Sequence, residues 1–178
     1  MIRRLSFALA VFCIMAPASV FGQAPTTKPV SVDAMKKLDY LAGKWKGAGW
    51  IMMGPQRREE FNQTENVQSK LDGTILTIDG SGRSKPDDRP VHNAFGVIYY
   101  DAPSSEYKFM AFLADGRSVL ADFKVTDNGF VWGFKAPYGQ IRYTMTHTAK
   151  DEWNEIGERS ADGSTWSKMF EMTLTRDK

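Results

Sequence analysis

Short segments of alternating apolar and polar residues, separated by turn residues, fill most of this chain. A period of two is typical of β-strands that have one buried face. Glycine, proline, aspartate and asparagine mark nine turns between the segments, as in Asp72-Gly73, Asp115-Gly116 and Asn128-Gly129. The pattern predicts ten strands, at about residues 44–52, 57–69, 74–81, 91–101, 106–114, 118–126, 130–136, 139–148, 152–160 and 165–176. Connections this short join only antiparallel neighbours, because a parallel crossover needs about a dozen residues or more.

Ten strands in a meander leave two exposed edges unless the first and last strands pair. Closure into a barrel removes those edges. We therefore predict an all-β fold, an up-and-down antiparallel barrel of roughly ten strands preceded by a short helix. Its interior should be mainly apolar, but Gln63 and Glu65 share a strand face with Phe61 and Val67. The interior should therefore also hold polar groups that need partners.

The N-terminal residues resemble a secretory signal. Arg3 and Arg4 precede an apolar stretch of about eleven residues, and small residues follow near position 22. We expect residues 1–22 to be a signal peptide that is removed on export to the periplasm or the medium. The apolar stretch is too short for a membrane anchor, which needs about twenty residues. We expect residues 23–32 to be a flexible lead-in and residues 33–178 to form one barrel domain. A short helix should come first, with Ser31 or Asp33 as its N-terminal cap.

Composition narrows the functional classes. The only cysteine, Cys13, lies in the predicted signal, so the mature chain should contain no disulfide. Removing Arg3 and Arg4 takes the formal charge from +2 to about zero. Binding of nucleic acid needs a clustered positive excess, so we expect no nucleic-acid partner. Oligomeric state stays open.

The first and last strands carry a known signature. Gly43-Lys44-Trp45 after a short helix, together with Arg176 near the end, resembles the calycin superfamily of lipocalins and fatty-acid-binding proteins. The resemblance spans residues 38–176, and is strongest to a bacterial family of exported, lipocalin-like domains of unknown function. It implies that Gly43, Trp45 and Arg176 close one end of the barrel. Gly47 and Gly49 beside Trp45 fit either space for a ligand or a sharply coiled strand.

The same opening also resembles nitrobindin-like haem barrels. In those barrels a histidine on the last strand, seven residues before the terminal arginine, holds the haem. The corresponding residue here is Met169, and methionine as the lone protein ligand to haem is unusual. We therefore expect no haem or other cofactor. We also expect no metal site, because the chain has only two histidines, His92 and His147.

The leading functional hypothesis is non-covalent binding of a small, mainly apolar molecule inside the barrel. The candidate ligand-binding residues are polar or aromatic side chains expected near the interior: Glu65, Gln63, Tyr143, His147, Trp132 and Arg159. Arg142 and Tyr143 are adjacent and cannot both face inward; if the apolar face of that strand is inside, Tyr143 is inside too.

Two alternatives remain open. One is a small barrel enzyme, an isomerase or hydrolase that uses Glu65, Tyr143 or His147 as acid or base. The other is an envelope interaction module that acts through an outward Trp50. No established nucleophile or phosphate-binding motif is present, so no catalytic residue is assigned.

Overall fold

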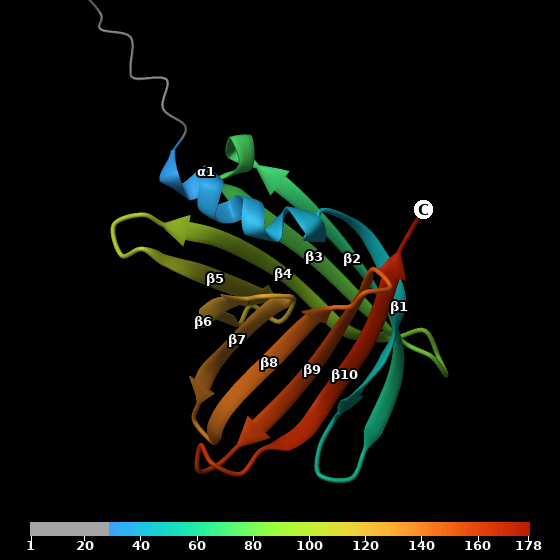
Figure 1. The fold of residues 1–178 in the computed structure, drawn as a ribbon. Helices are drawn as coiled ribbons and strands as arrows, with labels where there is room; N and C mark the ends of the chain where they lie inside the picture. Colours follow the sequence, from blue (N-terminus) through green and yellow to red (C-terminus); the bar gives the residue numbers. More distant parts are fainter. Residues whose placement is uncertain (1–28) are drawn as a thin grey trace, which may run out of the picture.

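The computed structural model describes residues 29–178, and the predicted signal peptide lies outside the described residues. Two short helical segments precede ten strands (Figure 1). The helical segments are α1 (Val30–Met35) and η1 (Lys36–Leu41), and a third, η2 (Leu71–Gly73), lies between two strands. The strands are β1 (Gly43–Met52), β2 (Arg58–Lys70), β3 (Ile75–Ser84), β4 (Pro90–Asp101), β5 (Glu106–Leu113), β6 (Ser118–Thr126), β7 (Gly129–Ala136), β8 (Gly139–His147), β9 (Glu152–Ser160) and β10 (Ser167–Arg176).

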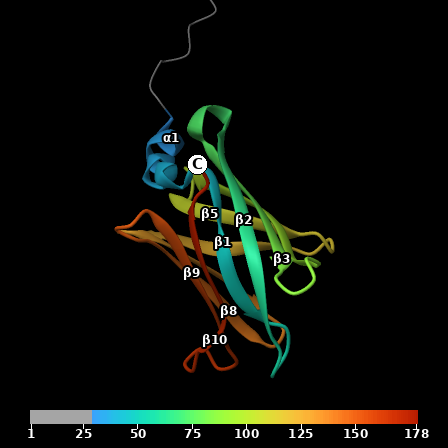
Figure 2. The same cartoon turned by 90° about the vertical axis from the view of Figure 1, so that its right-hand side faces the viewer.

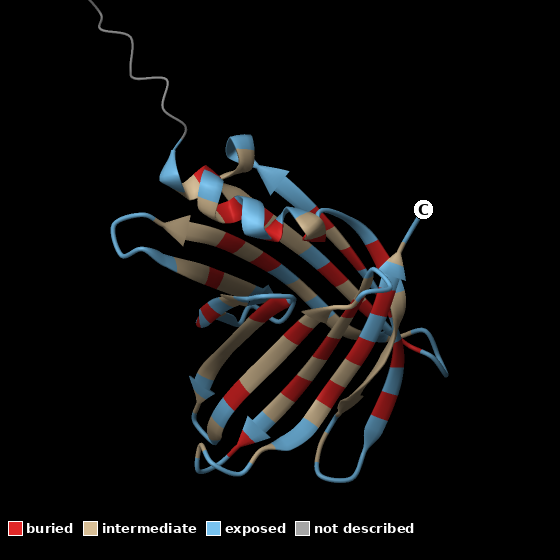
Figure 3. Cartoon of the chain, viewed as in Figure 1, coloured by how far each residue is buried: buried red, intermediate tan, exposed pale blue. Residues whose placement is uncertain are grey.

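The ten strands form a closed antiparallel barrel. Each strand pairs with its sequence neighbours, and β1 also pairs with β10, where Trp45 lies opposite Arg176. This confirms the predicted fold class. Buried and more exposed positions alternate along the strands, as the period-two pattern requires (Figure 3). The core inside the barrel combines aliphatic residues with several aromatic ones, among them Phe61, Phe109, Phe130 and Trp153.

The helical segments lie across one end of the barrel (Figures 1 and 2). Met35, Leu38 and Leu41 are buried there, as their helical spacing predicts. The expected capping by Ser31 or Asp33 is wrong. The helix begins at Val30, directly after the extended Pro29, and no side chain caps its first turn. The backbone oxygen of Pro29 accepts from the N–H of Val32 over 2.9 Å at this end of the helix.

The glycines of β1 serve close packing. A Cβ atom at Gly47 would lie 2.0 Å from the backbone oxygen of Thr173, and one at Gly49 would lie 2.7 Å from Cβ of Met172. No room for a ligand therefore exists at either position. The first possibility left by the sequence, space for a ligand, is therefore wrong. The glycines instead let β1 approach β10 more closely than side chains at these positions would allow.

Strand β3 is longer than predicted. Its sequence, with Gly80 and Gly82, suggests a strand that ends near residue 81, yet pairing continues until Ser84 lies opposite Phe61. The connection to β4 is correspondingly short and lies at the end of the barrel away from α1. There the guanidinium of Arg89 donates to the buried carboxylate of Glu59. This ion pair covers part of that end of the barrel.

Candidate functional site

Gln63 and Glu65 lie inside the barrel on β2, with 2% and 6% of their surface exposed. The amide of Gln63 donates to Oε1 of Glu65 over 2.7 Å, whereas Oε1 of Gln63 and Oε2 of Glu65 have no hydrogen-bond partner among the described residues. Both free oxygens rest against glycines. A Cβ atom at Gly80 would lie 2.6 Å from Glu65 Oε2, and one at Gly82 would lie 2.5 Å from Gln63 Oε1. The two polar side chains thus occupy the volume that these glycines leave.

A second buried acid, Glu155 on β9, lies in the same interior. The indoles of Trp132 and Trp153 donate to its two carboxyl oxygens over 3.0 and 2.9 Å. Burial raises the pKa of Glu65 to about 8, and the charge of Glu155 acts in the same direction. Burial also raises the pKa of Glu155 itself, against the lowering effect of the two indoles. The candidate residues predicted from the sequence did not include Glu155, although its strand face is the one that carries Trp153.

Trp132 and Tyr143 form the aromatic centre of the barrel. Their rings stack with centroids 4.2 Å apart, and Phe109 meets the other side of Trp132 edge-on at 5.0 Å. Burial raises the pKa of the Tyr143 hydroxyl, so that hydroxyl stays protonated at neutral pH. Arg142 faces outward, where it donates to Glu158 over 2.7 Å. The apolar face of β8 is therefore the inner one, and Tyr143 lies inside the barrel. The sequence alone had not decided which face of this strand is inside.

The end of the barrel beneath η1 is organised around Arg176. Its guanidinium lies 4.0 Å from the centre of the Trp45 ring, and donates to the backbone oxygens of Tyr40 and Ala42. It also donates to Asp151 over 3.2 Å, and the other oxygen of Asp151 lies 2.7 Å from Nε2 of His147. Gly43, at the start of β1, takes φ of +126°, and a Cβ atom there would lie 2.9 Å from the Arg176 guanidinium. The predicted closure residues therefore lie in direct contact.

Three other residues singled out in the sequence take no part in the polar contacts described above. Arg159 is exposed near the opposite end of the barrel, at the end of β9. Trp50 faces outward, where its indole donates to Glu171 and Arg58 stacks over its ring at 4.4 Å. Met169 is the extra residue of a bulge in β10 and packs against the hydrophobic core.

The barrel wall opens where β5 and β6 diverge. Their pairing runs only from Lys108 opposite Asp122 to Phe112 opposite Ser118, whereas β6 continues to Thr126. Over residues 123–126 the strand β6 is paired with β7 alone. Since alternate residues of a strand direct their backbone groups to opposite neighbours, part of the backbone of this stretch faces the opening.

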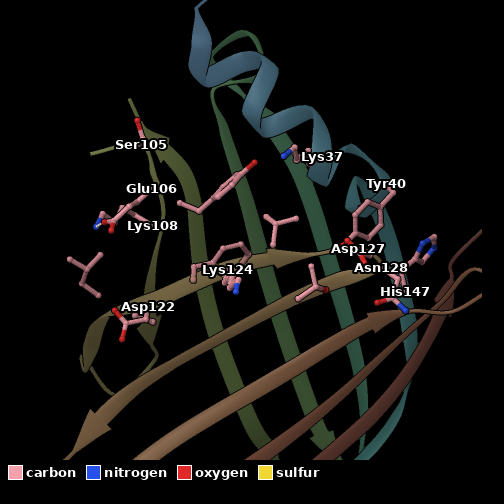
Figure 4. Close-up of a pocket in the computed structure, with 16 residues that line it drawn as sticks. Lys37, Tyr40, Ser105, Glu106, Lys108, Asp122, Lys124, Asp127, Asn128 and His147 are labelled. Atoms are coloured by element: carbon pink, nitrogen blue, oxygen red, sulfur yellow. Dashed lines mark hydrogen bonds and ion pairs between the residues drawn. The ribbon is translucent and has the colours of Figure 1, made fainter. Parts of the chain in front are cut away.

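A cleft of about 970 Å³ occupies this opening, between η1 and the diverging strands (Figure 4). Its apolar surface comes from the inward-facing residues of β5 and β6, namely Tyr107, Ala121, Phe123 and Val125. Its charged surface comes from η1, β5, β6 and the turn after β6: Lys37, Glu106, Lys108, Asp122, Lys124 and Asp127. Tyr40 and His147 stack with centroids 4.8 Å apart and form one end of the cleft.

The structure divides the six predicted ligand-binding residues. His147 lines the cleft, whereas Gln63, Glu65, Trp132 and Tyr143 contact one another or the aromatic core, and Arg159 lies near the opposite end. Glu65, Tyr143 and His147, the residues of the enzyme alternative, do not line one common cavity among those described here. Tyr40 lines the cleft but was not among the predicted site residues, because the pattern of its helix points only to the buried apolar face of Met35, Leu38 and Leu41.

Clusters of metal-ligating side chains and membrane-spanning helices are both absent from residues 29–178. These residues place no group of three or more histidine, cysteine, aspartate or glutamate side chains where a metal ion could be held. Within the same part of the chain, every helix is too short or too polar to cross a membrane.

Comparisons with known proteins give a fold and no family. No protein-family model matches the chain, and no curated protein matches it significantly in sequence. Among solved structures, Rv2717c from M. tuberculosis is similar, with a TM-score of 0.62 and 16% identity over 82% of this chain and 98% of that one. The S-type phycobiliprotein lyase CPES from Guillardia theta is similar with a TM-score of 0.57 and 13% identity, over 83% of this chain and 93% of that one.

These likenesses, together with the closed ten-stranded topology, are consistent with a calycin-like barrel fold. A barrel of this class is compatible with ligand binding. At such low identity the likeness extends to the fold alone, since one fold hosts many unrelated functions.

Proposed function

We propose that this protein binds a small, mainly apolar molecule non-covalently in the cleft between η1, β5 and β6. The observation that carries the proposal is the cleft itself, whose volume of about 970 Å³ lies at the upper end of the range for small-molecule sites. Its aromatic and aliphatic residues supply the apolar contacts that such sites use, although charged residues are more numerous around it than in most of them. The centre of the barrel is a poorer candidate, because the side chains of Glu65, Gln63 and the aromatic cluster fill the space beside its glycines.

The expected affinity follows from the apolar surface that a ligand would cover. Burial of about 300 Å² of apolar surface contributes roughly 7 kcal/mol. Loss of translational and rotational freedom offsets part of this. A dissociation constant in the micromolar range or weaker is therefore expected for a ligand that has only apolar contacts.

A bulkier side chain in the cleft should weaken binding. Val125 faces into the cleft from β6, and the substitution Val125→Trp should weaken binding of the fluorescent probe anilinonaphthalene sulfonate by about tenfold or more, because the larger side chain takes the probe's place. Val131→Trp, on the outer face of the neighbouring strand β7, is the matched control and should bind the probe as the wild type does. Fluorescence titration gives both constants, and circular dichroism checks the fold. Absence of saturable binding to the wild type, or equal binding by both variants, would contradict the proposal.

The proposal extends to location. The pattern of residues 1–22 supports export to the periplasm or the medium, and the order of Gly43, Trp45 and Arg176 supports membership of the exported lipocalin-like family that the sequence resembles. Expression of the full chain in a bacterium should yield a shorter protein in the periplasmic or culture fraction. Mass spectrometry should place its N-terminus near residue 23. A full-length chain that stays in the cytoplasm would contradict export.

A further inference from the structure

The hydroxyl of Tyr40 is a buried hydrogen-bonding group without a partner among residues 29–178. Buried tyrosine hydroxyls are normally hydrogen-bonded, since leaving such a group unsatisfied destabilises the folded state. The other tyrosine of the cleft, Tyr107, follows this rule and donates to the backbone oxygen of Ala34 over 2.7 Å. The two tyrosines that line the cleft thus differ. The hydroxyl of Tyr107 has an acceptor, and the hydroxyl of Tyr40 has none among the described residues.

Tyr40 is held from two sides. Arg176 donates to its backbone oxygen, and the ring of His147 stacks against its ring at 4.8 Å. Asp151 links these two supports, because it accepts from Arg176 and contacts His147 Nε2. Figure 4 shows the side chain extending from η1 towards the strand ends that carry Asn128 and His147. A ring held in this way has lost much of its conformational freedom before a ligand arrives, which reduces the entropic cost of binding.

The protonation state makes this group a donor. Burial raises the pKa of Tyr40 to about 12, so the hydroxyl keeps its proton under physiological conditions. Water does not reach the hydroxyl oxygen in this structure. No described residue supplies an acceptor for this donor. Tyr40 lines the cleft, so a molecule that enters this end of it can supply one once the atoms that cover the hydroxyl move aside.

We propose that the Tyr40 hydroxyl is the hydrogen-bond donor of the cleft, and that the ligand is an apolar molecule that carries a carbonyl oxygen. This inference rests on the proposed binding function and specifies its ligand class. A carbonyl oxygen satisfies the hydroxyl without bringing a second charge into a site whose charged residues, Lys37 and Lys124 with Asp122 and Asp127, already balance. A pure hydrocarbon would fill the same volume but leave the hydroxyl unpaired.

The test compares two ligands of one shape on two proteins. The probes are methyl nonyl ketone and the alkene in which a methylene group replaces the ketone oxygen, each measured by displacement of anilinonaphthalene sulfonate. The measured quantity is the ratio of the affinity for the ketone to the affinity for the alkene. This ratio should be about fivefold lower in Tyr40→Phe than in the wild type, as expected for the loss of one neutral hydrogen bond. Because the comparison is a ratio, the greater hydrophobicity of the alkene cancels. Tyr138→Phe, an exposed tyrosine outside the cleft, should leave the ratio unchanged.

The outcomes separate the inference from the function on which it rests. Without ligand, Tyr40→Phe should melt no lower than the wild type, because the hydroxyl that it removes has no partner. A ratio that is equal in wild type and Tyr40→Phe, with both ligands bound, would overturn the role of Tyr40 and leave the binding cleft standing. A clear loss of stability in Tyr40→Phe would also overturn it, because the hydroxyl would then have a partner within the protein. Failure of the wild type to bind either ligand or the probe would overturn the binding function itself.

Discussion

Replacing Glu65 with glutamine is expected to make the protein more stable at alkaline pH and to leave it nearly unchanged at about pH 5. The folded protein holds the pKa of Glu65 at about 8, because burial disfavours its charged form, whereas its ordinary value is 4.5. Between these two values the folded state binds a proton that the unfolded state has released. Stability is therefore lost as the pH rises through this window. Glutamine has the same shape and no charge, so at pH above about 8 the gain should be on the order of 3 kcal/mol.

Urea unfolding at about pH 5 and about pH 8.5 measures this effect. The matched control is Glu60→Gln, an exposed glutamate on the same strand that pairs with Lys85, which should shift stability by less than about 1 kcal/mol at either pH. Some decline with pH should persist in Glu65→Gln, because burial also raises the pKa of Glu155. A wild type whose stability does not change between the two pH values would show that Glu65 is not buried as a neutral acid.

Replacing Arg176 with methionine should destabilise the protein by about 2–3 kcal/mol, since hydrogen bonds from a charged donor and a cation–π contact are lost together. The side chain donates to the backbone oxygens of Tyr40, within η1, and of Ala42, directly after it, and lies over Trp45. Methionine keeps much of the apolar length of arginine, so the loss reports mainly on the guanidinium. We also expect η1 to become sensitive to proteolysis, because Arg176 is its link to the last strand.

Arg159→Met removes an exposed arginine from the neighbouring strand β9 and serves as the control. A change there should stay within about 0.5 kcal/mol. Urea unfolding compares the two variants, and limited proteolysis followed by mass spectrometry locates the first cut. Equal stability of both variants, with no new cut before Gly43, would contradict the role of Arg176 in closing the barrel.

The fold could be predicted from local features. Turn pairs such as Asp115-Gly116 and Asn128-Gly129 lie between strands whose observed bounds differ from the predicted ones by no more than three residues. The largest differences are at β3, which continues through Gly82 to Ser84 because β2 and β4 offer partners on both sides. Glycine weakens a strand when taken alone, but hydrogen bonds to two neighbours outweigh that local preference.

The candidate site was less predictable. Alternation correctly placed Gln63 and Glu65 inside the barrel. It could not show that their side chains pack against Gly80 and Gly82 on the neighbouring strand. The cleft depends on the residue at which β5 stops pairing with β6, and the residues on either side of Lys108 carry no signal for that. Tyr40 became a candidate only when its hydroxyl was found buried and unpartnered at the end of that cleft.

The sequence by itself therefore determined the strands and their antiparallel order, because alternation, turn chemistry and short connections act between residues close in the chain. The contact of Trp45 with Arg176 joins distant parts of the chain, and it was expected only from the resemblance to the calycins. Only the tertiary structure decided where the barrel opens, and which side chains are left with free polar atoms. Both depend on how ten strands share a closed circumference. Closure links the pairing of every strand to that of all the others, so no single segment encodes it.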